Sequence, residues 1–270
     1  MFLNVKIVED IMQQYAPSKL KEEYDNVGLM VGDESAQVTK ILIALDCTMD
    51  VINEAKESGC NLILTHHPLL FVKPKTITSD TLIGKKIIEL IKNDINVYSS
   101  HTNLDCAQGG LNDIATEILG FNKYTIIEPS KDNNAQSSSG IGRLVQLNEP
   151  IKLLELCENV KRTFNAEFIR YVGNDNDLIR TIAIINGSGE DFFYISKEMG
   201  ADCVITGDTK YHGVSDLKEE NIALIDAGHF ATEWTPLQIF GEKLKKKLKE
   251  YGYDNQVIIS QSTHDPYKMM

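Results

Sequence analysis

Two stretches of the chain share one pattern of hydrophobic and polar positions. Residues 41–65 read ILIALDCTMDVINEAKESGCNLILT and residues 182–206 read IAIINGSGEDFFYISKEMGADCVIT, which align without a gap at an offset of 182 − 41 = 141. Seven aligned positions are identical, whereas chance would give about one or two identities in such a window. We interpret the two stretches as copies of an internal repeat.

Each copy predicts a βαβ unit. A β-branched apolar run is followed by a helix-period stretch that ends at Gly59 or Gly200, and a second apolar run comes next. Parallel strands joined by a right-handed crossover place their carboxyl ends at one edge of the sheet, where open α/β sheets bind ligands. We therefore expect residues 65–67 (THH) and 206–208 (TGD) at equivalent strand ends of two related halves.

A second correspondence follows each repeat. INVYSSHTNLD, around His101 and Asp105, and ALIDAGHFATE, around His229 and Glu233, each contain an apolar run, a histidine and an acid four residues later. The offset is constant, since 229 − 101 = 128 and 233 − 105 = 128. Where such a segment is helical, positions i and i+4 share a face, so both side chains can reach one metal ion.

The polar segment 128–140 (EPSKDNNAQSSSG) predicts a linker between the two halves. The first half then comprises 1–127 and the second 141–270, and the C-terminal segment can pack back on the first half. The helix-period segments that can cover the sheets are 5–20, 82–92, 111–119 and 237–249. The predicted fold class is α/β, with two related domains that each contain a mixed sheet covered by helices.

Composition excludes several classes of protein. The 270 residues are 42% hydrophobic and 24% charged, as in ordinary globular proteins. A net charge of −12 disfavours general nucleic-acid binding, and the lysine run 243–249 is interpreted as a solvated helix face. Five scattered cysteines without a C-x-x-C pair fit a reducing compartment. With no secretory signal and no membrane-spanning run, we expect a soluble cytoplasmic protein without membrane association.

The histidines carry the strongest chemical signal. Five of the six fall at or just beyond predicted strand ends: His66, His67, His101, His212 and His229. Imidazole with carboxylate suits divalent Zn, Fe, Mn or Co, and the shortage of thiolate disfavours a structural zinc cage. The alternative is that partly buried histidines close a sheet edge without binding metal. Adjacent residues of a strand point to opposite sides of the sheet. His66 and His67 can therefore bind one ion only if the strand has already ended, and otherwise they can bind two ions about 3.5–4 Å apart.

Three neighbouring features have more than one interpretation. Asp105 either binds metal, as its pairing with Glu233 favours, or caps the helix predicted at 111–119. His101 is either a ligand or, as we favour, a residue that orients a ligand and carries protons. The run 186–189 (NGSG) fits either a phosphate-binding turn or a tight structural turn.

Five motifs occur in the order typical of one protein family: DNVGL (25–29), THHPLLF (65–71), HTNLD (101–105), TGDTKYH (206–212) and DAGHFATE (226–233). The chain resembles the Nif-three-like proteins, commonly catalogued as GTP cyclohydrolase I type II homologues. The resemblance extends from about Ile7 to about Leu237, and it is to the short form without an inserted middle domain. Region 128–150 and the tail after Asn255 match no part of the family pattern.

The resemblance implies two α/β domains with a dinuclear metal site at their interface, assembled into a toroidal homohexamer whose sites face an internal cavity. It also implies the ligands for two divalent ions per chain, and all five are present: His66, His67, Asp105, His229 and Glu233.

The leading functional hypothesis is metal-dependent hydrolysis of a nucleotide-like or phosphorylated small molecule, with His101 or Glu233 handling protons. GTP cyclohydrolase activity enters through the family label alone, and no residue pattern identifies a guanine pocket. The alternative is a non-enzymatic protein, either a metal-binding scaffold or a protein-interaction adaptor.

Overall fold

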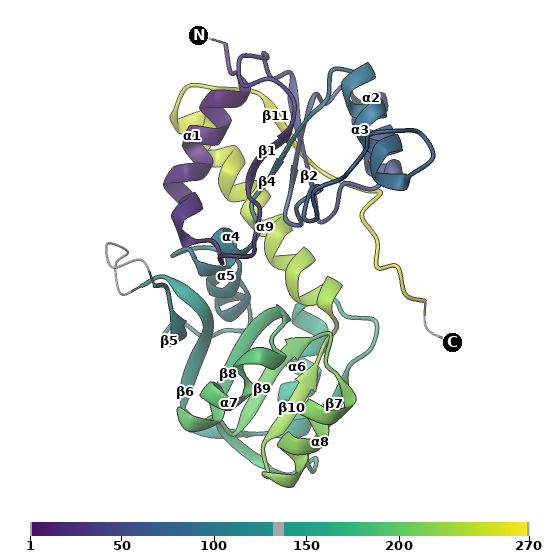
Figure 1. Cartoon of the computed structure of the whole chain (residues 1–270). Coiled ribbons are helices and arrows are strands. Elements are labelled where there is room, and N and C mark those ends of the chain that lie inside the picture. The colour runs from purple at the N-terminus through teal and green to yellow at the C-terminus, as the bar shows by residue number, and fades with distance from the viewer. Residues whose placement is uncertain (1, 132–137, 269) are drawn as a thin grey trace. The chain divides into compact units, whose positions relative to one another are not determined.

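The computed structural model describes residues 2–131, 138–268 and 270. The chain forms two compact units (Figure 1). Unit 1 consists of Met1–Leu104 and Leu237–Met270, and unit 2 consists of Asp105–Pro236. Two helices contain the boundaries between the units, namely α4 (Thr102–Cys106) and α9 (His229–Glu250). Among the described residues, no helix is long and apolar enough to cross a membrane.

Unit 1 contains a five-stranded mixed sheet in the order β1-β4-β3-β2-β11. Its strands are β1 (Gly28–Val31), β2 (Lys40–Ala44), β3 (Leu62–Thr65), β4 (Asn96–Ser99) and β11 (Gln256–Ile259). The last four strands run parallel to one another, and β1 pairs antiparallel with β4. Every residue of β3 is buried, as the continuous apolar run of a central parallel strand predicts.

Helices cover both faces of the unit 1 sheet (Figure 1). They are α1 (Val5–Tyr15), η1 (Ser18–Leu20), α2 (Met49–Ser58), α3 (Leu82–Lys92) and the unit 1 part of α9. Val51 of α2 and Leu90 of α3 pack with Leu42 of β2 in one core cluster. Gly241 of α9 lies against Ile43. Because Leu42 and Ile43 alternate along β2, α9 covers the opposite face from α2 and α3.

Short side chains determine where the unit 1 helices begin. Asn4, Thr48 and Thr81 each accept a hydrogen bond from a backbone N–H in the first turn of α1, α2 and α3, respectively. Gly59 ends α2 with a φ of 70°, a left-handed conformation that glycine adopts without a steric penalty.

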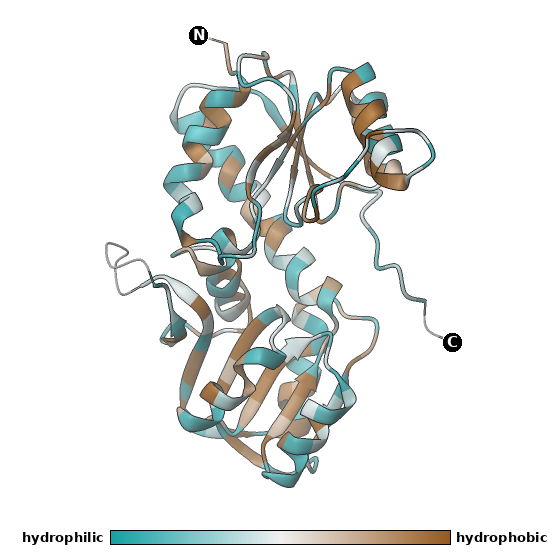
Figure 2. Ribbon diagram, in the orientation of Figure 1, coloured by the Kyte–Doolittle hydropathy of each residue, from teal (hydrophilic) through white to brown (hydrophobic). Residues whose placement is uncertain are grey.

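Unit 2 contains a six-stranded mixed sheet in the order β5-β6-β8-β9-β10-β7. Its strands are β5 (Thr125–Pro129), β6 (Gly140–Lys152), β7 (Arg170–Val172), β8 (Leu178–Ser188), β9 (Cys203–Gly207) and β10 (Ala223–Asp226). β8, β9 and β10 are parallel, whereas β5, β6 and β7 pair antiparallel with their neighbours. The strands form the hydrophobic interior of the unit (Figure 2).

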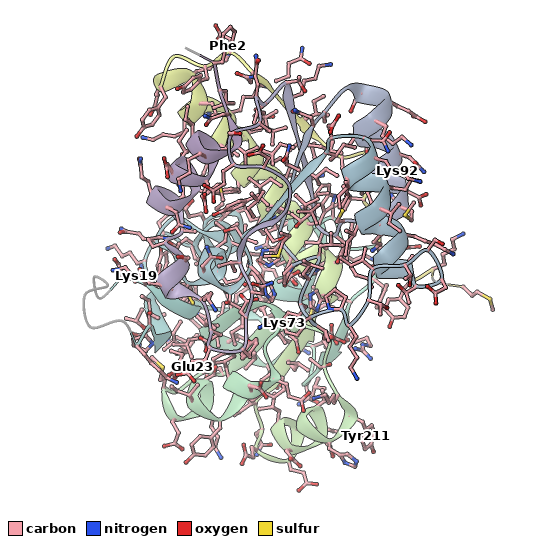
Figure 3. All side chains as sticks on the ribbon, turned by 45° about the horizontal axis from the view of Figure 1, so that its top comes forward. Phe2, Lys19, Glu23, Lys73, Lys92 and Tyr211 are labelled. Atoms are coloured by element: carbon pink, nitrogen blue, oxygen red, sulfur yellow. The ribbon has the colours of Figure 1, made fainter. Side chains whose placement is uncertain are left out.

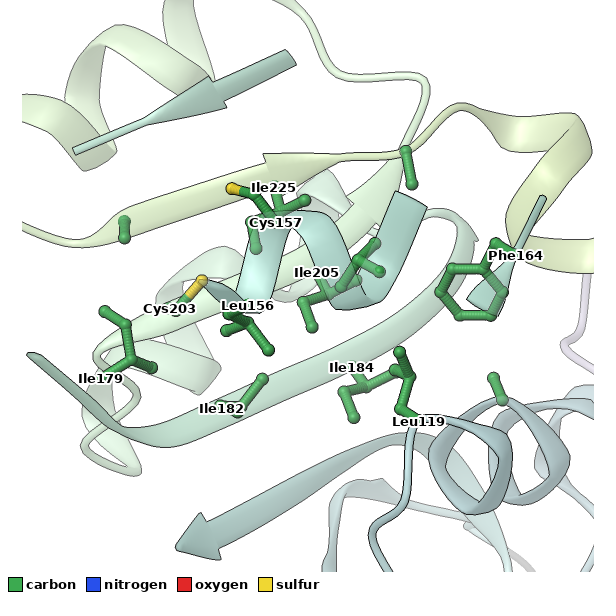
Figure 4. Close-up of a cluster of buried hydrophobic side chains, with 14 of the residues drawn as sticks. Leu119, Leu156, Cys157, Phe164, Ile179, Ile182, Ile184, Cys203, Ile205 and Ile225 are labelled. Atoms are coloured by element: carbon green, nitrogen blue, oxygen red, sulfur yellow. The ribbon is translucent and has the colours of Figure 1, made fainter. Parts of the chain in front are cut away.

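The unit 2 helices also lie on both faces of their sheet. They are α5 (Leu111–Ile118), α6 (Leu153–Thr163), η2 (Glu190–Phe192), α7 (Phe193–Glu198) and α8 (Tyr211–Glu219). One core cluster joins Ala115 of α5 and Leu156 of α6 to strand residues such as Ile184 and Ile205 (Figure 4). α7 and α8 connect the parallel strands and lie on the other face (Figure 1).

Both copies of the repeat form βαβ units with the same register. Ile41 of β2 pairs with Leu62 of β3, and Ile182 of β8 pairs with Cys203 of β9. The offset between the copies is 182 − 41 = 141 for the first strand and 203 − 62 = 141 for the second. This equivalence confirms the predicted α/β class with two mixed sheets covered by helices.

The units divide the chain differently from the predicted halves. β11 pairs with β2, so the C-terminal segment belongs to unit 1. Helix α5 belongs to unit 2, because its buried face, which includes Ile114, packs against β6 and β8. Of the predicted linker 128–140, residues 132–137 lie outside the described residues. Its ends form a hairpin within the unit 2 sheet, where Pro129 pairs with Gly140.

Candidate metal centre

Three imidazole rings meet at the carboxyl edge of the unit 1 sheet. His66 and His67 follow β3, and His101 follows the parallel strand β4. The ring centroids are 5.2 Å apart for His66 and His67, 5.1 Å for His66 and His101, and 5.6 Å for His67 and His101. One ligand atom of each ring lies within 4.8 Å of the others, so the three rings can hold a metal ion.

The two adjacent histidines reach one cluster because β3 has already ended. Its last residue is Thr65, whose hydroxyl donates a hydrogen bond to the carbonyl of His67 at 2.9 Å. The backbone N–H groups of His66 and His67 donate to the carbonyls of Ala44 and Leu45. This turn removes the strand alternation that would direct the rings to opposite sides.

Hydrogen bonds determine which nitrogen His66 and His67 offer to a metal. Nδ1 of His66 lies 3.0 Å from the carbonyl oxygen of Ser100, which can accept but not donate, so Nδ1 carries the hydrogen. Nδ1 of His67 lies 2.9 Å from the carboxylate of Asp46 and is protonated for the same reason. In a neutral ring the lone pair is then on Nε2, which is the ligand atom that each histidine offers.

Asp25 orients the third ring, His101. Its carboxylate lies 2.9 Å from Nδ1 of His101, and it accepts hydrogen bonds from the backbone N–H and the hydroxyl of Thr102. Burial disfavours the charged form of Asp25, but the hydrogen bonds from His101 and Thr102 outweigh this effect and lower its pKa to about 2. Asp25 is therefore ionised at neutral pH, and His101 offers Nε2 as a ligand or as a proton carrier.

In unit 2, His229 and Glu233 form a pair on α9. The helix begins at His229, so Glu233 lies one turn further on, and Nε2 of His229 is 3.1 Å from Oε2 of Glu233. Asp208, in the turn after β9, lies 3.6 Å from Nδ1 of His229. Glu233 is 4% exposed, so its carboxylate is held in a protein environment in which a bound cation would stabilise its charge.

The two His-x-x-x-acid segments are not equivalent in position. Ser99, the last residue of β4, pairs with Thr65, and Asp226, the last residue of β10, pairs with Thr206. Thr65 and Thr206 are equivalent in the repeat, so the strand ends are offset by 226 − 99 = 127. The two motifs are offset by 128. Gly228, with a φ of 85°, is part of a turn that is one residue longer in the second half. As a result, His101 precedes α4, whereas His229 is the first residue of α9.

Asp105 lies on α4 and does not cap α5. The residue that precedes α5 is Gly110, and no side chain caps that helix. The Asp105 side chain is half-buried, and its main-chain carbonyl accepts a hydrogen bond from the Asn112 amide at 3.2 Å. The capping interpretation is therefore wrong, because Asp105 lies five positions before Gly110, the residue at the start of α5.

The glycine-rich loop 186–189 supports Glu233 and does not form a phosphate cradle. The N–H of Gly187 donates to the Thr232 hydroxyl at 3.0 Å, and the N–H of Gly189 donates to the Thr206 hydroxyl at 2.9 Å. A Cβ atom at Gly187 would lie 2.1 Å from Oε1 of Glu233. The structure thus shows the tight structural turn, in which glycine leaves space for the carboxylate.

The donor set suits a divalent transition metal. Neutral imidazoles with carboxylates are the ligands that Zn, Fe, Mn and Co accept, whereas Mg and Ca prefer oxygen donors. Burial raises the pKa of the Cys47 thiol to about 12, and among the described residues the groups that could hold a metal ion contain no cysteine. His212 is exposed on α8 and belongs to neither group of site residues.

Sequence reasoning missed Asp25 and Asp46, which hold two of the three rings. Asp46 stands two residues beyond the end of β2, so its position at a strand end was a usable signal. Asp25 is the first residue of the DNVGL motif, but its partner His101 is 76 residues away. A single sequence contains no signal for that contact.

Comparisons with known proteins identify relatives of this chain. The model of a family described as Duf34/NIF3 (NGG1p interacting factor 3) matches residues 3–266. A relative from Clostridium acetobutylicum, named GTP cyclohydrolase 1 type 2 homolog, is 53% identical over 268 residues, which cover 99% of each chain. A relative of the same name from Clostridium perfringens is 53% identical over 266 residues, which cover 98% of each chain.

Solved structures include a similar fold. The crystal structure of a hypothetical protein from Staphylococcus aureus matches with a TM-score of 0.92 at 29% identity, and all of both chains is covered. The family model and the curated relatives confirm the resemblance inferred from the five sequence motifs. The chain therefore belongs to the Duf34/NIF3 family.

Proposed function

We propose that this protein is a metal-dependent hydrolase of a nucleotide-like or phosphorylated small molecule. Two divalent ions per chain would be held by the expected ligands, namely His66, His67, Asp105, His229 and Glu233. The observation that carries the proposal is the orientation of the unit 1 rings. Protein oxygens fix His66 and His67 at Nδ1, which leaves Nε2 of each ring as the metal donor atom, an arrangement typical of metal-binding histidines.

The protein's own residues would support hydrolysis around these ions. Divalent metals in such sites supply Lewis acidity and activate water at neutral pH. His101, held by the ionised Asp25, can accept a proton at Nε2 and release it again, which suits a general base or acid. Asp25 would stabilise the protonated ring during that step.

Space for a substrate group lies beside His67. A cavity of about 260 Å³ is lined by residues that include Asp46, His67, Leu82 and Lys86. The ammonium group of Lys86 can attract an anionic group such as a phosphate to the edge of the imidazole cluster. A cavity of this size accommodates part of a small molecule, which fits a substrate with one group inside and the remainder outside.

Metal content and turnover test the proposal separately. Elemental analysis of protein purified with supplemented metal should give close to two transition-metal ions per chain. The number of bound ions should fall in each of three variants: His66→Ala, Asp105→Ala and His229→Ala. The circular dichroism spectrum of each variant should remain that of the folded protein. The matched control is His264→Ala, which removes an exposed histidine outside the site. One ion or none in the wild-type protein would count against the dinuclear site.

Turnover is measured with the metal-loaded protein against nucleotides and phosphoesters. We expect hydrolysis by the wild type and His264→Ala, and a loss of at least about 100-fold in kcat/KM for His66→Ala. A chelator-treated sample should lose activity and regain it when metal is returned. Activity that persists in His66→Ala would overturn the assignment of hydrolysis to this site.

One surface feature favours the adaptor as a second candidate. Downstream of the two histidines, the segment 71–82 exposes several large apolar side chains, with Val72 79% and Leu82 63% exposed. Exposed apolar surface of this kind is common where another protein binds. Full metal occupancy without turnover of any substrate class would favour this function, with the ions in a structural role.

A further inference from the structure

A second cavity, of about 420 Å³, lies within unit 2 and contains none of the proposed metal ligands. Its floor includes Val172 of β7 and Leu224 of β10, which pair directly across the two strands. One face of α8 forms its wall at positions i, i+3, i+4 and i+7: Tyr211, Val214, Ser215 and Lys218. The volume is within the range of small-molecule sites, about 300–1,000 Å³.

The cavity reaches the carboxyl edge of the parallel strands. Asp226 is the last residue of β10, and Thr209 and Lys210 follow the end of the parallel strand β9. In open α/β sheets, ligands bind outside the carboxyl ends of the strands, because the loops there can present side chains to them. The cavity therefore occupies a position in which the fold commonly binds small molecules.

A buried carboxylate anchors an arginine at this end. Asp226 is 2% exposed, and it forms an ion pair with Arg170. The Thr209 hydroxyl donates to Asp226 Oδ2 at 2.6 Å, and the N–H of Gly228 donates to Oδ1 at 3.0 Å. The side chain of Arg170 is 64% exposed, so its guanidinium is fixed in direction while it remains accessible to a ligand.

Cations outnumber acids among the residues that line this cavity. Arg170, Lys210 and Lys218 line it, against the single carboxylate of Asp226, although the chain carries a net charge of −12. Within the described ranges, neither lysine side chain forms an ion pair. Two acids contact the lining from outside it: Glu190 accepts a hydrogen bond from the backbone N–H of Lys210 at 3.0 Å, and Asp175 accepts one from the Tyr171 hydroxyl at 2.9 Å. The ammonium groups of Lys210 and Lys218 are therefore the charges that attract an anion, and the apolar floor favours a ligand that also has an apolar body.

We propose that this cavity binds a small organic phosphate with a ring-sized apolar body, of the nucleoside monophosphate class. The phosphate lies between Arg170 and Lys210, whose guanidinium and ammonium groups can donate hydrogen bonds to its oxygens. The ring rests on the floor formed by Val172 and Leu224. Tyr211, which projects from α8 and is 80% exposed, supplies an aromatic surface at the rim (Figure 3). All residues of this site belong to unit 2, and ligand binding there does not depend on metal.

Calorimetric titration of chelator-treated protein with AMP tests the proposal without any contribution from metal. We expect saturable binding by the wild type, weakened by added salt because the phosphate contacts are ionic. The variant Lys210→Ala/Lys218→Ala should raise the Kd at least about fivefold. Both lysines are exposed, so this variant should fold. Lys161→Ala, at an exposed lysine of α6 outside the cavity, should bind like the wild type.

Two further titrations separate the parts of the ligand. Adenosine alone and inorganic phosphate alone should each bind more weakly than AMP by at least about tenfold, since each uses one half of the cavity. Equal affinity for AMP and inorganic phosphate would overturn the proposal, because the apolar floor would then contribute nothing. The absence of saturation by AMP at about 1 mM, or equal affinity in the double variant, would overturn it as well.

Discussion

The carboxylate of Asp25 and the imidazole of His101 form a hydrogen-bonded pair, with 2.9 Å between Oδ1 and Nδ1. The contact joins the segment before β1 to the end of β4. Since the acid holds the ring at Nδ1, the direction of Nε2 depends on a residue that is not itself a ligand. Acids in this position raise the basicity of a histidine and fix its tautomer.

Replacement of Asp25 tests this relationship. We expect Asp25→Asn to lower kcat/KM of the metal-loaded protein about 10- to 100-fold, because the amide carries no charge and cannot stabilise the protonated His101 ring. Turnover of the metal-loaded protein measures this loss, and competition with a chromogenic chelator checks that the metal affinity is kept. Asp33→Asn makes the same change at an exposed acid that accepts hydrogen bonds from Ser35. Wild-type kcat/KM in Asp25→Asn would show that the pair does not act in catalysis.

The glycine at position 187 provides a second test, directed at Glu233. A methyl group at Gly187 would meet Oε1 of Glu233 at 2.1 Å, and the backbone there has a φ of 61°. We expect Gly187→Ala to lower the free energy of unfolding by about 1–3 kcal/mol and to reduce metal occupancy as the carboxylate is displaced.

Gly200→Ala separates the two causes in that experiment. Gly200 also has a positive φ, 86°, but an added Cβ would meet nothing within 4 Å. This variant should lose stability and keep its metal content. Equal metal content in both variants would mean that contact with Glu233 is unimportant, whereas the unfolding measurements would still report the backbone strain.

Glu54 of α2 predicts a pH dependence in unit 1. It accepts hydrogen bonds from the Ser260 hydroxyl and from the backbone N–H groups of Gln261 and Ser262, at 2.6, 2.8 and 3.0 Å. Burial favours the neutral acid, but these hydrogen bonds outweigh it and lower the pKa of Glu54 below its usual value of 4.5. The interaction therefore stabilises the fold fully above pH 4.5 and is lost as pH falls through the lowered pKa.

Glu54→Gln should reduce the free energy of unfolding by about 1 kcal/mol at neutral pH, and the difference from the wild type should shrink in acid. Thermal unfolding at a series of pH values measures this change. Glu57→Gln alters an exposed acid on the same helix and should leave the pH profile unchanged. If the difference in free energy of unfolding between the wild type and Glu54→Gln stays constant down to about pH 2, the pKa of Glu54 is not coupled to folding in the expected direction.

Assembly is a separate expectation, which we take from the family resemblance. We propose a homohexamer and expect light scattering to give a particle of about six times the chain mass of 30.2 kDa. A net charge of −12 per chain opposes association, so mixed contacts that use the lysines of 243–249 would favour it. A monodisperse monomer at micromolar concentration and moderate salt would refute the hexamer.

The sequence by itself determined the parts of this protein that depend on short-range patterns. The two βαβ units could be predicted because strand and helix periods, and the offset of 141, are visible within each repeat. The strand-end position of His66 and His67 follows from the apolar run that precedes them. The His229–Glu233 pair follows from the i, i+4 geometry of a helix, which needs no information from elsewhere in the chain.

Two features could be decided only by the tertiary structure: the unit to which α5 belongs, and the hydrogen bond between Asp25 and His101. The apolar face of α5 can cover either sheet, and the choice of unit 2 depends on which sheet leaves a face uncovered. Asp25 reaches His101 across 76 residues because β1 pairs with β4 and brings the two loops together. Such contacts depend on strand order, and strand order results from the packing of the whole unit, which periodicity along a single chain does not encode.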